Sequence, residues 1–149
     1  MKFFKMKLFK MIPLLFTLLS LFSCSAETAS SIAPEITAIE PAQIQQQWLL
    51  VAIDGQTIDT RISSTLTVSA VNKATGNLAC NNFFGTLQLQ NNRLKIDKMG
   101  STRKMCQSKT DEVETIVSAI LSDWSEVLLN DNRMILIGKA HRLNYQAKQ

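Results

Sequence analysis

The sequence predicts an α+β domain. A curved, half-barrel-like antiparallel β-meander of about seven or eight strands is expected to carry one amphipathic helix, inserted before the last strands and packed on the sheet. Three observations predict this class. Residues 48–97 contain short apolar runs and alternating stretches typical of strands. Between residues 110 and 124 the apolar spacing changes to that of a helix. After residue 125, short apolar runs separated by polar turn residues return.

The first elements begin near residue 41. Pro41 to Gln45 can start one helical turn, because proline is favoured at the first helical position. The apolar run Trp48 to Ile53 ends at Asp54-Gly55, a tight-turn dipeptide, and predicts a strand that enters a turn. Residues 65–70 alternate between polar and apolar side chains, which predicts a half-buried strand. Thr86–Gln90 and Arg93–Asp97 are separated by two asparagines and predict a hairpin, because asparagine tolerates the positive φ of a two-residue turn.

Residues 110–124 predict the helix. Thr110 is the expected N-cap, and the acidic residues Asp111, Glu112 and Glu114 are explained by the helix dipole. The apolar stripe consists of Val113, Ile116, Val117, Ile120, Leu121 and Trp124. Three further strands are expected at residues 126–129, 133–137 and 141–145, where apolar runs follow turn signals.

Residues 1–23 predict a signal peptide. Four lysines precede the uncharged apolar segment that begins at Met11. That segment, up to Cys24, is shorter than the about 20 residues a transmembrane helix needs, so a permanent membrane span is the weaker alternative. Its end, Leu21-Phe22-Ser23-Cys24, resembles the lipobox of bacterial lipoproteins. The resemblance implies that Cys24 is acylated and becomes the mature N-terminus. Ser25, which is not aspartate, then implies an outer-membrane lipoprotein facing the periplasm, without specifying the leaflet.

Removing this leader changes what the composition means. Residues 24–41 are rich in Ser, Ala, Thr, Glu and Pro and predict a tether, which leaves residues 42–149 as one domain. That length excludes a two-domain enzyme with a separate cofactor module. The chain has 16 basic and 12 acidic residues, but four lysines lie in the leader, so the remainder is neutral. A neutral domain without a basic cluster argues against nucleic acid as a partner.

Cys80 and Cys106 form an even pair in a chain expected to be exported. An oxidising compartment favours a disulfide between them. A redox pair is disfavoured because no C-x-x-C is present, and a metal site with His141 lacks a fourth ligand. Two unpaired buried thiols remain the other alternative.

The segments around these cysteines, residues 76–85 (GNLACNNFFG) and 100–106 (GSTRKMC), resemble the two signatures of the META (HslJ-like) domain family. The resemblance covers about residues 40–147. One departure is Ala79, where many members have glycine. Physically, the first signature is a strand entering a tight connection, and the motif residues are expected to specify the fold. The positions that match are Gly76, Cys80, Asn81, Phe83, Gly85, Thr102, Met105 and Cys106.

No catalytic constellation is expected. His141 is the only histidine and is interpreted as a surface or edge-strand residue. The acidic residues are explained by the helix start and by turns, and five glycines provide no phosphate-binding loop. We therefore expect a non-enzymatic protein with no cofactor and no metal.

Family members are envelope or secreted proteins associated with stress and, in bacteria, with antibiotic tolerance. The resemblance therefore implies an envelope-stress lipoprotein, anchored to the membrane through Cys24. We expect a monomer that binds an unknown envelope protein or an apolar ligand through the open side of its sheet. The alternative is a small periplasmic inhibitor or a docking protein similar to a secretin pilot, which would use an exposed contiguous patch.

Overall fold

The computed structural model describes residues 38–148. The signal peptide, Cys24 and most of the tether lie outside the described residues, so the predictions made for them stay predictions. Within the described part, the elements are η1 (a 3₁₀ helix, Pro41–Ile44), β1 (Gln47–Ile53), β2 (Gln56–Thr57), β3 (Thr65–Val68), β4 (Lys73–Asn77), β5 (Asn82–Gln90), β6 (Arg93–Ser101), α1 (Ser108–Ser122), β7 (Ser125–Asn130), β8 (Arg133–Ile137) and β9 (Arg142–Ala147).

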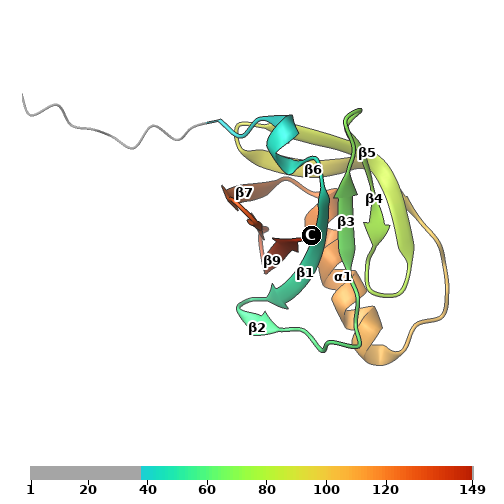
Figure 1. Cartoon of the computed structure of the whole chain (residues 1–149). Helices are drawn as coiled ribbons and strands as arrows, with labels where there is room; N and C mark the ends of the chain where they lie inside the picture. Colours follow the sequence, from blue (N-terminus) through green and yellow to red (C-terminus); the bar gives the residue numbers. More distant parts are fainter. Residues whose placement is uncertain (1–37, 149) are drawn as a thin grey trace, which may run out of the picture. The chain divides into compact units, whose positions relative to one another are not determined.

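The strands form one antiparallel sheet in the order β2-β1-β3-β4-β5-β6-β7-β8-β9 (Figure 1). The α+β class with one helix before the last strands is confirmed. β9 also pairs with β1, with Leu50 opposite Tyr145 and Ile53 opposite Leu143. This pairing closes the expected half-barrel into a barrel, so the sheet is not open between β1 and β9. A pairing between the first and last strands leaves no local sequence pattern, which is why the half-barrel prediction did not include it.

The two turns predicted from sequence are confirmed. Asp54 and Gly55 have φ of 51° and 81°, and Asn91 and Asn92 have φ of 50° and 55°. Such values are those that a two-residue hairpin turn requires. The β5–β6 hairpin is longer than predicted and contains a register shift between Phe84 and Thr86.

Side chains fill the inside of the barrel, as in other small barrels. Inward positions alternate with outward ones along each strand, so that β1 buries Trp48, Leu50 and Ala52. The Trp48 indole donates a hydrogen bond to the Ile44 carbonyl oxygen at 3.0 Å, which satisfies its buried N–H. Tyr145 is also buried, and burial raises the pKa of its hydroxyl. The largest fully buried side chains are Trp48, Tyr145, Ile44, Leu50, Leu66, Leu78, Leu94, Ile96, Leu121, Met134, Leu136 and Leu143.

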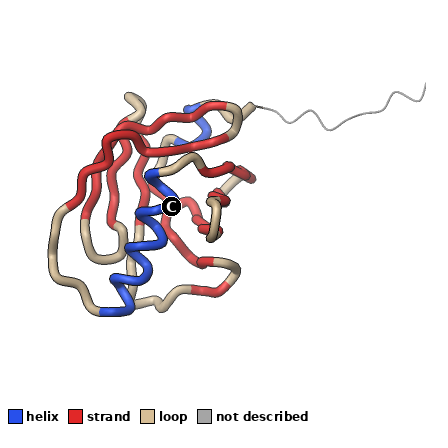
Figure 2. The backbone as a smooth tube through the Cα atoms, turned by 180° about the vertical axis from the view of Figure 1, so that it is seen from behind, coloured by secondary structure: helices blue, strands red, loops and turns tan. Residues whose placement is uncertain are grey.

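Helix α1, blue in Figure 2, packs against β6. It buries Val117, Ile120 and Leu121. It begins earlier than predicted, with Gln107 at the N-cap. The expected N-cap Thr110 lies inside the first turn instead, where its hydroxyl donates to the Gln107 carbonyl oxygen at 2.8 Å. The helix also ends at Ser122, so Trp124 follows it and is not part of its buried stripe.

The β6–β7 pairing is the shortest in the barrel wall. It contains only Arg93 opposite Glu126 and Leu94 opposite Ser125. Beyond Leu94, strand β6 therefore leaves β7, and α1 packs against it.

Candidate functional site

Asn81 is the centre of a polar cluster that we call the signature corner, formed by Asn81, Thr102, Glu114 and the Cys80–Cys106 pair. Asn81 is only 4% exposed. Its Oδ1 accepts hydrogen bonds from the Thr102 hydroxyl at 2.9 Å and from the Lys104 backbone N–H at 2.7 Å. One buried amide thus holds the β4–β5 connection to the loop that precedes α1.

Glu114 completes this cluster from α1. Its Oε2 accepts from the Asn81 backbone N–H at 2.8 Å, and its Oε1 accepts from Asn81 Nδ2 at 2.9 Å. The sequence interpretation, which assigned Glu114 only to the helix dipole, missed this role. A signal was present, because Glu114 precedes Val117 and Leu121 by three and seven positions and so shares the buried face of the helix.

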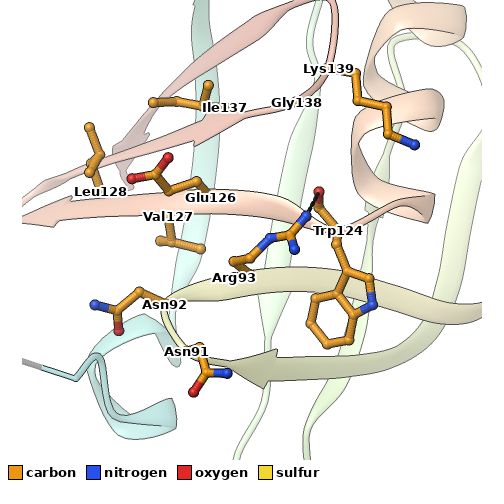
Figure 3. A pocket seen from close by; sticks show the side chains of 10 residues that line it. All are labelled: Asn91, Asn92, Arg93, Trp124, Glu126, Val127, Leu128, Ile137, Gly138 and Lys139. Carbon is orange, nitrogen blue, oxygen red and sulfur yellow. Dashed lines mark hydrogen bonds between the residues drawn. The ribbon is translucent and has the colours of Figure 1, made fainter.

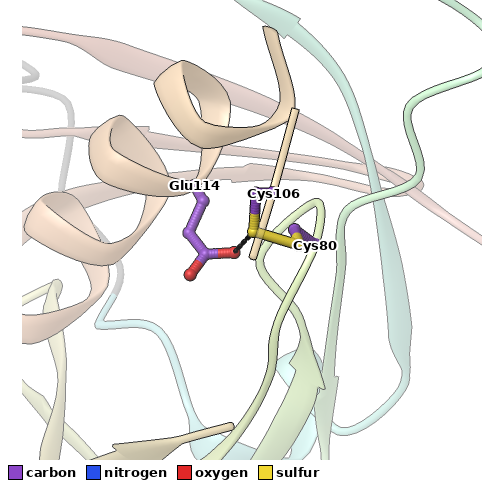
Figure 4. Close-up of side chains that lie close together, drawn as sticks. All are labelled: Cys80, Cys106 and Glu114. Carbon is purple, nitrogen blue, oxygen red and sulfur yellow. Dashed lines mark hydrogen bonds between the residues drawn. A yellow bond between two sulfur atoms is a disulfide. The ribbon is translucent and has the colours of Figure 1, made fainter. Parts of the chain in front are cut away.

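Cys80 and Cys106, for which a disulfide was expected, are bonded in the structure, with Cα atoms 6.0 Å apart. The bridge joins the β4–β5 connection to the loop before α1. The Glu114 carboxylate points toward it, with Oε2 3.9 Å from Cys106 Sγ (Figure 4). Backbone, side chain and disulfide therefore hold the same two segments together.

The glycines of the family motif stand where a side chain would not fit. A Cβ on Gly76 would lie 1.9 Å from the Thr65 carbonyl oxygen, and one on Gly85 would lie 2.5 Å from Ile96 Cγ2. Phe83 is 3% exposed and belongs to the core.

Two positions of the signatures stand apart. Met105 was expected to have a structural role, but its side chain is fully exposed. The loop that contains it is held by Asn81 and by the disulfide instead. Ala79 has a φ of 120°, a region that favours glycine. The departure noted in the sequence is therefore a site of backbone strain.

A groove lies over the short paired stretch at the start of β6 and of β7, beside the Asn91–Asn92 turn (Figure 3). It has a volume of about 620 Å³, and we call it the Trp124 groove. Arg93 donates a hydrogen bond to the Trp124 carbonyl oxygen at 3.0 Å, and Lys95 lies 5.2 Å from the centre of the Trp124 ring. These contacts fix the indole beside the groove. The side chains that line it include Arg93, Trp124, Glu126, Leu128, Ile137 and Lys139.

The groove continues past Trp124 into a smaller hollow of about 160 Å³, lined also by Asp123 and His141. Lys139 lies in both and forms an ion pair with Asp123 at 2.6 Å, which lowers the pKa of that carboxyl. Leu128, at the rim of the larger hollow, is 46% exposed. Within residues 38–148, no strand pairs with Leu128 to Asn130 on the β6 side.

His141 is a partly exposed residue just before β9, and its Nδ1 lies 2.7 Å from Asp54 Oδ2. The hydrogen bond from His141 is the main cause that lowers the pKa of Asp54, and the Arg142 N–H adds to it. Asp54 Oδ1 accepts that N–H at 2.8 Å. The pair therefore links the β1–β2 turn to the start of β9.

A closed antiparallel barrel with one packed helix and a disulfide-bonded corner defines a small, rigid single-domain protein. No helix among the described residues has the length and apolar character to cross a membrane. The chain belongs to the META domain family, whose profile matches residues 41–149.

Solved structures show the same fold. A protein solved by NMR has 23% identity and a TM-score of 0.65, over 73% of this chain and 95% of that one. A Burkholderia xenovorans protein, also solved by NMR, has 21% identity and a TM-score of 0.59, over 75% of this chain and 90% of that one. A crystal structure of a DUF4847 family protein from Bacteroides vulgatus has 10% identity and a TM-score of 0.50, over 70% and 94%. No curated protein matches the sequence. Neither the META family nor these neighbours is a known enzyme family.

Proposed function

We propose that this protein is a non-enzymatic stress lipoprotein of the bacterial envelope, anchored to the outer membrane by acylated Cys24, and that its domain binds a protein partner through the Trp124 groove. The META family supports a stress-related role in a general sense. The anchor rests on the lipobox resemblance of residues 21–24.

The groove is the observation that carries the proposal. Tryptophan and arginine are enriched where protein interfaces derive most of their binding energy, and here Arg93 and Trp124 line the same groove as the exposed Leu128. Among residues 38–148 no strand pairs with Leu128 to Asn130 on the side of β7 away from β8, and this side offers backbone groups to an extended partner segment. Both features favour a protein that adds a short strand and inserts an apolar side chain.

An apolar ligand is the less favoured occupant. The inward positions of the barrel are filled by large side chains, and β1–β9 pairing closes the open side of the sheet through which a ligand was expected to bind. The groove itself contains Arg93, Glu126 and Lys139, and charged groups would lose hydration against a purely apolar molecule.

Site-specific photo-crosslinking in cells tests the docking surface. A photoreactive phenylalanine analogue at Leu128 should crosslink envelope proteins, whereas the same analogue at Val71, which is 80% exposed and does not line the groove, should not. Equal products from both positions, or none from Leu128, would contradict docking at the groove. A single stoichiometric partner would favour the alternative function, a dedicated periplasmic inhibitor or a docking protein similar to a secretin pilot.

Metabolic labelling with an alkyne fatty acid tests the anchor. The wild-type protein recovered in the membrane fraction of the cells should carry the label, and the Cys24→Ser variant should carry none. Recovery of the unlabelled, uncleaved wild-type chain from the soluble cell interior would refute the envelope location. If the location holds, loss of the protein should lower tolerance of envelope stress or antibiotics.

A further inference from the structure

The signature corner brings together three side chains that can ligate a metal. One sulfur from each of Cys80 and Cys106 and one carboxylate oxygen of Glu114 lie within 4.8 Å of one another. Among residues 38–148 this is the only group of three such ligands, and all three residues are half-buried. His141, the histidine weighed as a partner for the cysteines, is instead bonded to Asp54.

The spacing fits one small tetrahedral ion once the sulfur atoms are no longer bonded to each other. Zinc binds thiolate at about 2.3 Å and carboxylate oxygen at about 2.0 to 2.2 Å, so its ligand atoms lie roughly 3.3 to 3.8 Å apart. Glu114 Oε2 is already 3.9 Å from Cys106 Sγ (Figure 4). The Cα atoms of the cysteines are 6.0 Å apart, which lets side-chain rotation separate the two sulfur atoms without moving the backbone.

Asn81 holds the third ligand in place. It donates one hydrogen bond to each oxygen of the Glu114 carboxylate, and each oxygen keeps a lone pair for a metal. Hydrogen bonds of this kind orient the ligands of metal sites and raise their affinity. The carboxylate is therefore fixed toward the sulfur atoms whether or not they are bonded.

We propose that, after reduction of the Cys80–Cys106 disulfide, the two sulfur atoms and the Glu114 carboxylate form a zinc site. A dithiol reductant supplies two electrons and two protons; the S–S bond breaks, two thiols form, and the reductant becomes a disulfide. Zinc then displaces the two thiol protons to solvent and binds two thiolates and the carboxylate. Three protein ligands leave the fourth position for water.

The bound ion replaces the covalent bridge at the same place. It links the β4–β5 connection to the loop before α1, the two segments that the disulfide joins in the oxidised chain. Thiolate with carboxylate is a ligand set that suits zinc better than calcium or magnesium, which prefer oxygen alone. The corner therefore couples the thiol redox state of its compartment to metal binding.

Metal titration of the full chain in detergent tests the site. The chain carries Cys24→Ser, so that no third thiol contributes, and is either left oxidised or reduced with dithiothreitol and freed of it without oxygen. Cobalt, a spectroscopic probe for zinc, should bind the reduced chain one to one and give sulfur-to-cobalt charge-transfer bands with intense tetrahedral bands. Zinc should displace the cobalt, and the oxidised chain should bind neither.

Two matched variants decide whether Glu114 is a ligand. Glu114→Gln keeps an oxygen that can accept from Asn81 and should weaken zinc binding at least about 10-fold. Glu112→Gln, exposed on the same helix, should leave the affinity unchanged. Equal affinity for wild type and Glu114→Gln, or no binding to the reduced chain at micromolar zinc, would overturn the proposal. If the reduced chain unfolds, zinc must restore its circular-dichroism spectrum; failure to do so also overturns it. The partner proposal, tested on the oxidised chain, is unaffected by these results.

Discussion

Replacing Asn81 by alanine should be among the most destabilising polar substitutions in this chain. The substitution removes two hydrogen bonds accepted from Thr102 and Lys104 and one donated to the Glu114 carboxylate. A neutral hydrogen bond contributes about 0.5 to 1.5 kcal/mol and one to a charged group about 1.5 to 3 kcal/mol. Water can replace Asn81 as a partner of the partly exposed groups, so the free energy of unfolding should fall by about 3 kcal/mol, near the lower end of the sum of these three contributions.

Urea unfolding of the oxidised chain, followed by tryptophan fluorescence and circular dichroism, measures this loss. Asn82→Ala is the matched control, because Asn82 is exposed and its side chain accepts a single hydrogen bond from Asn77. The control should lose less than about 1 kcal/mol. In a double-mutant cycle, Asn81→Ala and Glu114→Gln should be coupled by more than about 0.5 kcal/mol. Losses of similar size for Asn81→Ala and Asn82→Ala, or additive effects in the cycle, would refute the role given to the corner.

Three further substitutions test other parts of the structure by the same unfolding measurement. Ala79→Gly should raise the free energy of unfolding by about 1 kcal/mol, because it relieves the strain of a residue at φ 120°. The control Ala119→Gly, at an exposed position of α1, should lower it by about 1 kcal/mol. Changes of the same sign in the two variants would contradict the strain at Ala79. Tyr145→Phe should be neutral or up to about 1 kcal/mol stabilising, because the buried hydroxyl has no hydrogen-bond partner among the described residues; a clear loss would reveal a partner. Asp54 has a pKa lowered from 3.8, so its ionised form stabilises the fold above that pH and the contribution is lost as pH falls through the lowered folded-state pKa. The stability difference between wild type and Asp54→Asn should therefore shrink below about pH 4, and a constant difference would contradict the stabilising hydrogen bonds to the Asp54 carboxylate.

The elements that sequence predicted best are those specified within a few residues. The asparagine pair at 91 and 92 fixes a two-residue turn, and the spacing from Val113 to Leu121 fixes a helix, because both signals depend only on near neighbours. Strand β4 (Lys73–Asn77) gave no alternating apolar pattern, since it buries only Ala74, and Gly76 takes a second inward position without a side chain.

The features that sequence did not predict join distant segments. The β1–β9 pairing and the contact between Asn81 and Glu114 depend on how the whole sheet closes. Trp124 was placed on the helix stripe because its spacing continued the pattern, but Asp123 has extended backbone dihedrals and ends the helix. The Trp124 groove followed from that break, and no pattern of single residues indicated it.

The corner and the groove lie at opposite ends of the same helix. The β6–β7 pairing contains two residue pairs, so beyond Leu94 β6 is paired with β5 on one side and packs against α1 instead of pairing with β7. The N-terminal turn of α1 follows the disulfide directly, and Glu114 attaches the helix to Asn81, whereas its C-terminal end leads within two residues to Trp124. The corner contacts, together with the core packing of α1, hold the helix whose end leads to Trp124, and Arg93 and Lys95 contact Trp124 itself. If the proposed docking at the Trp124 groove holds, a substitution that loosens the corner should therefore weaken partner binding as well as stability.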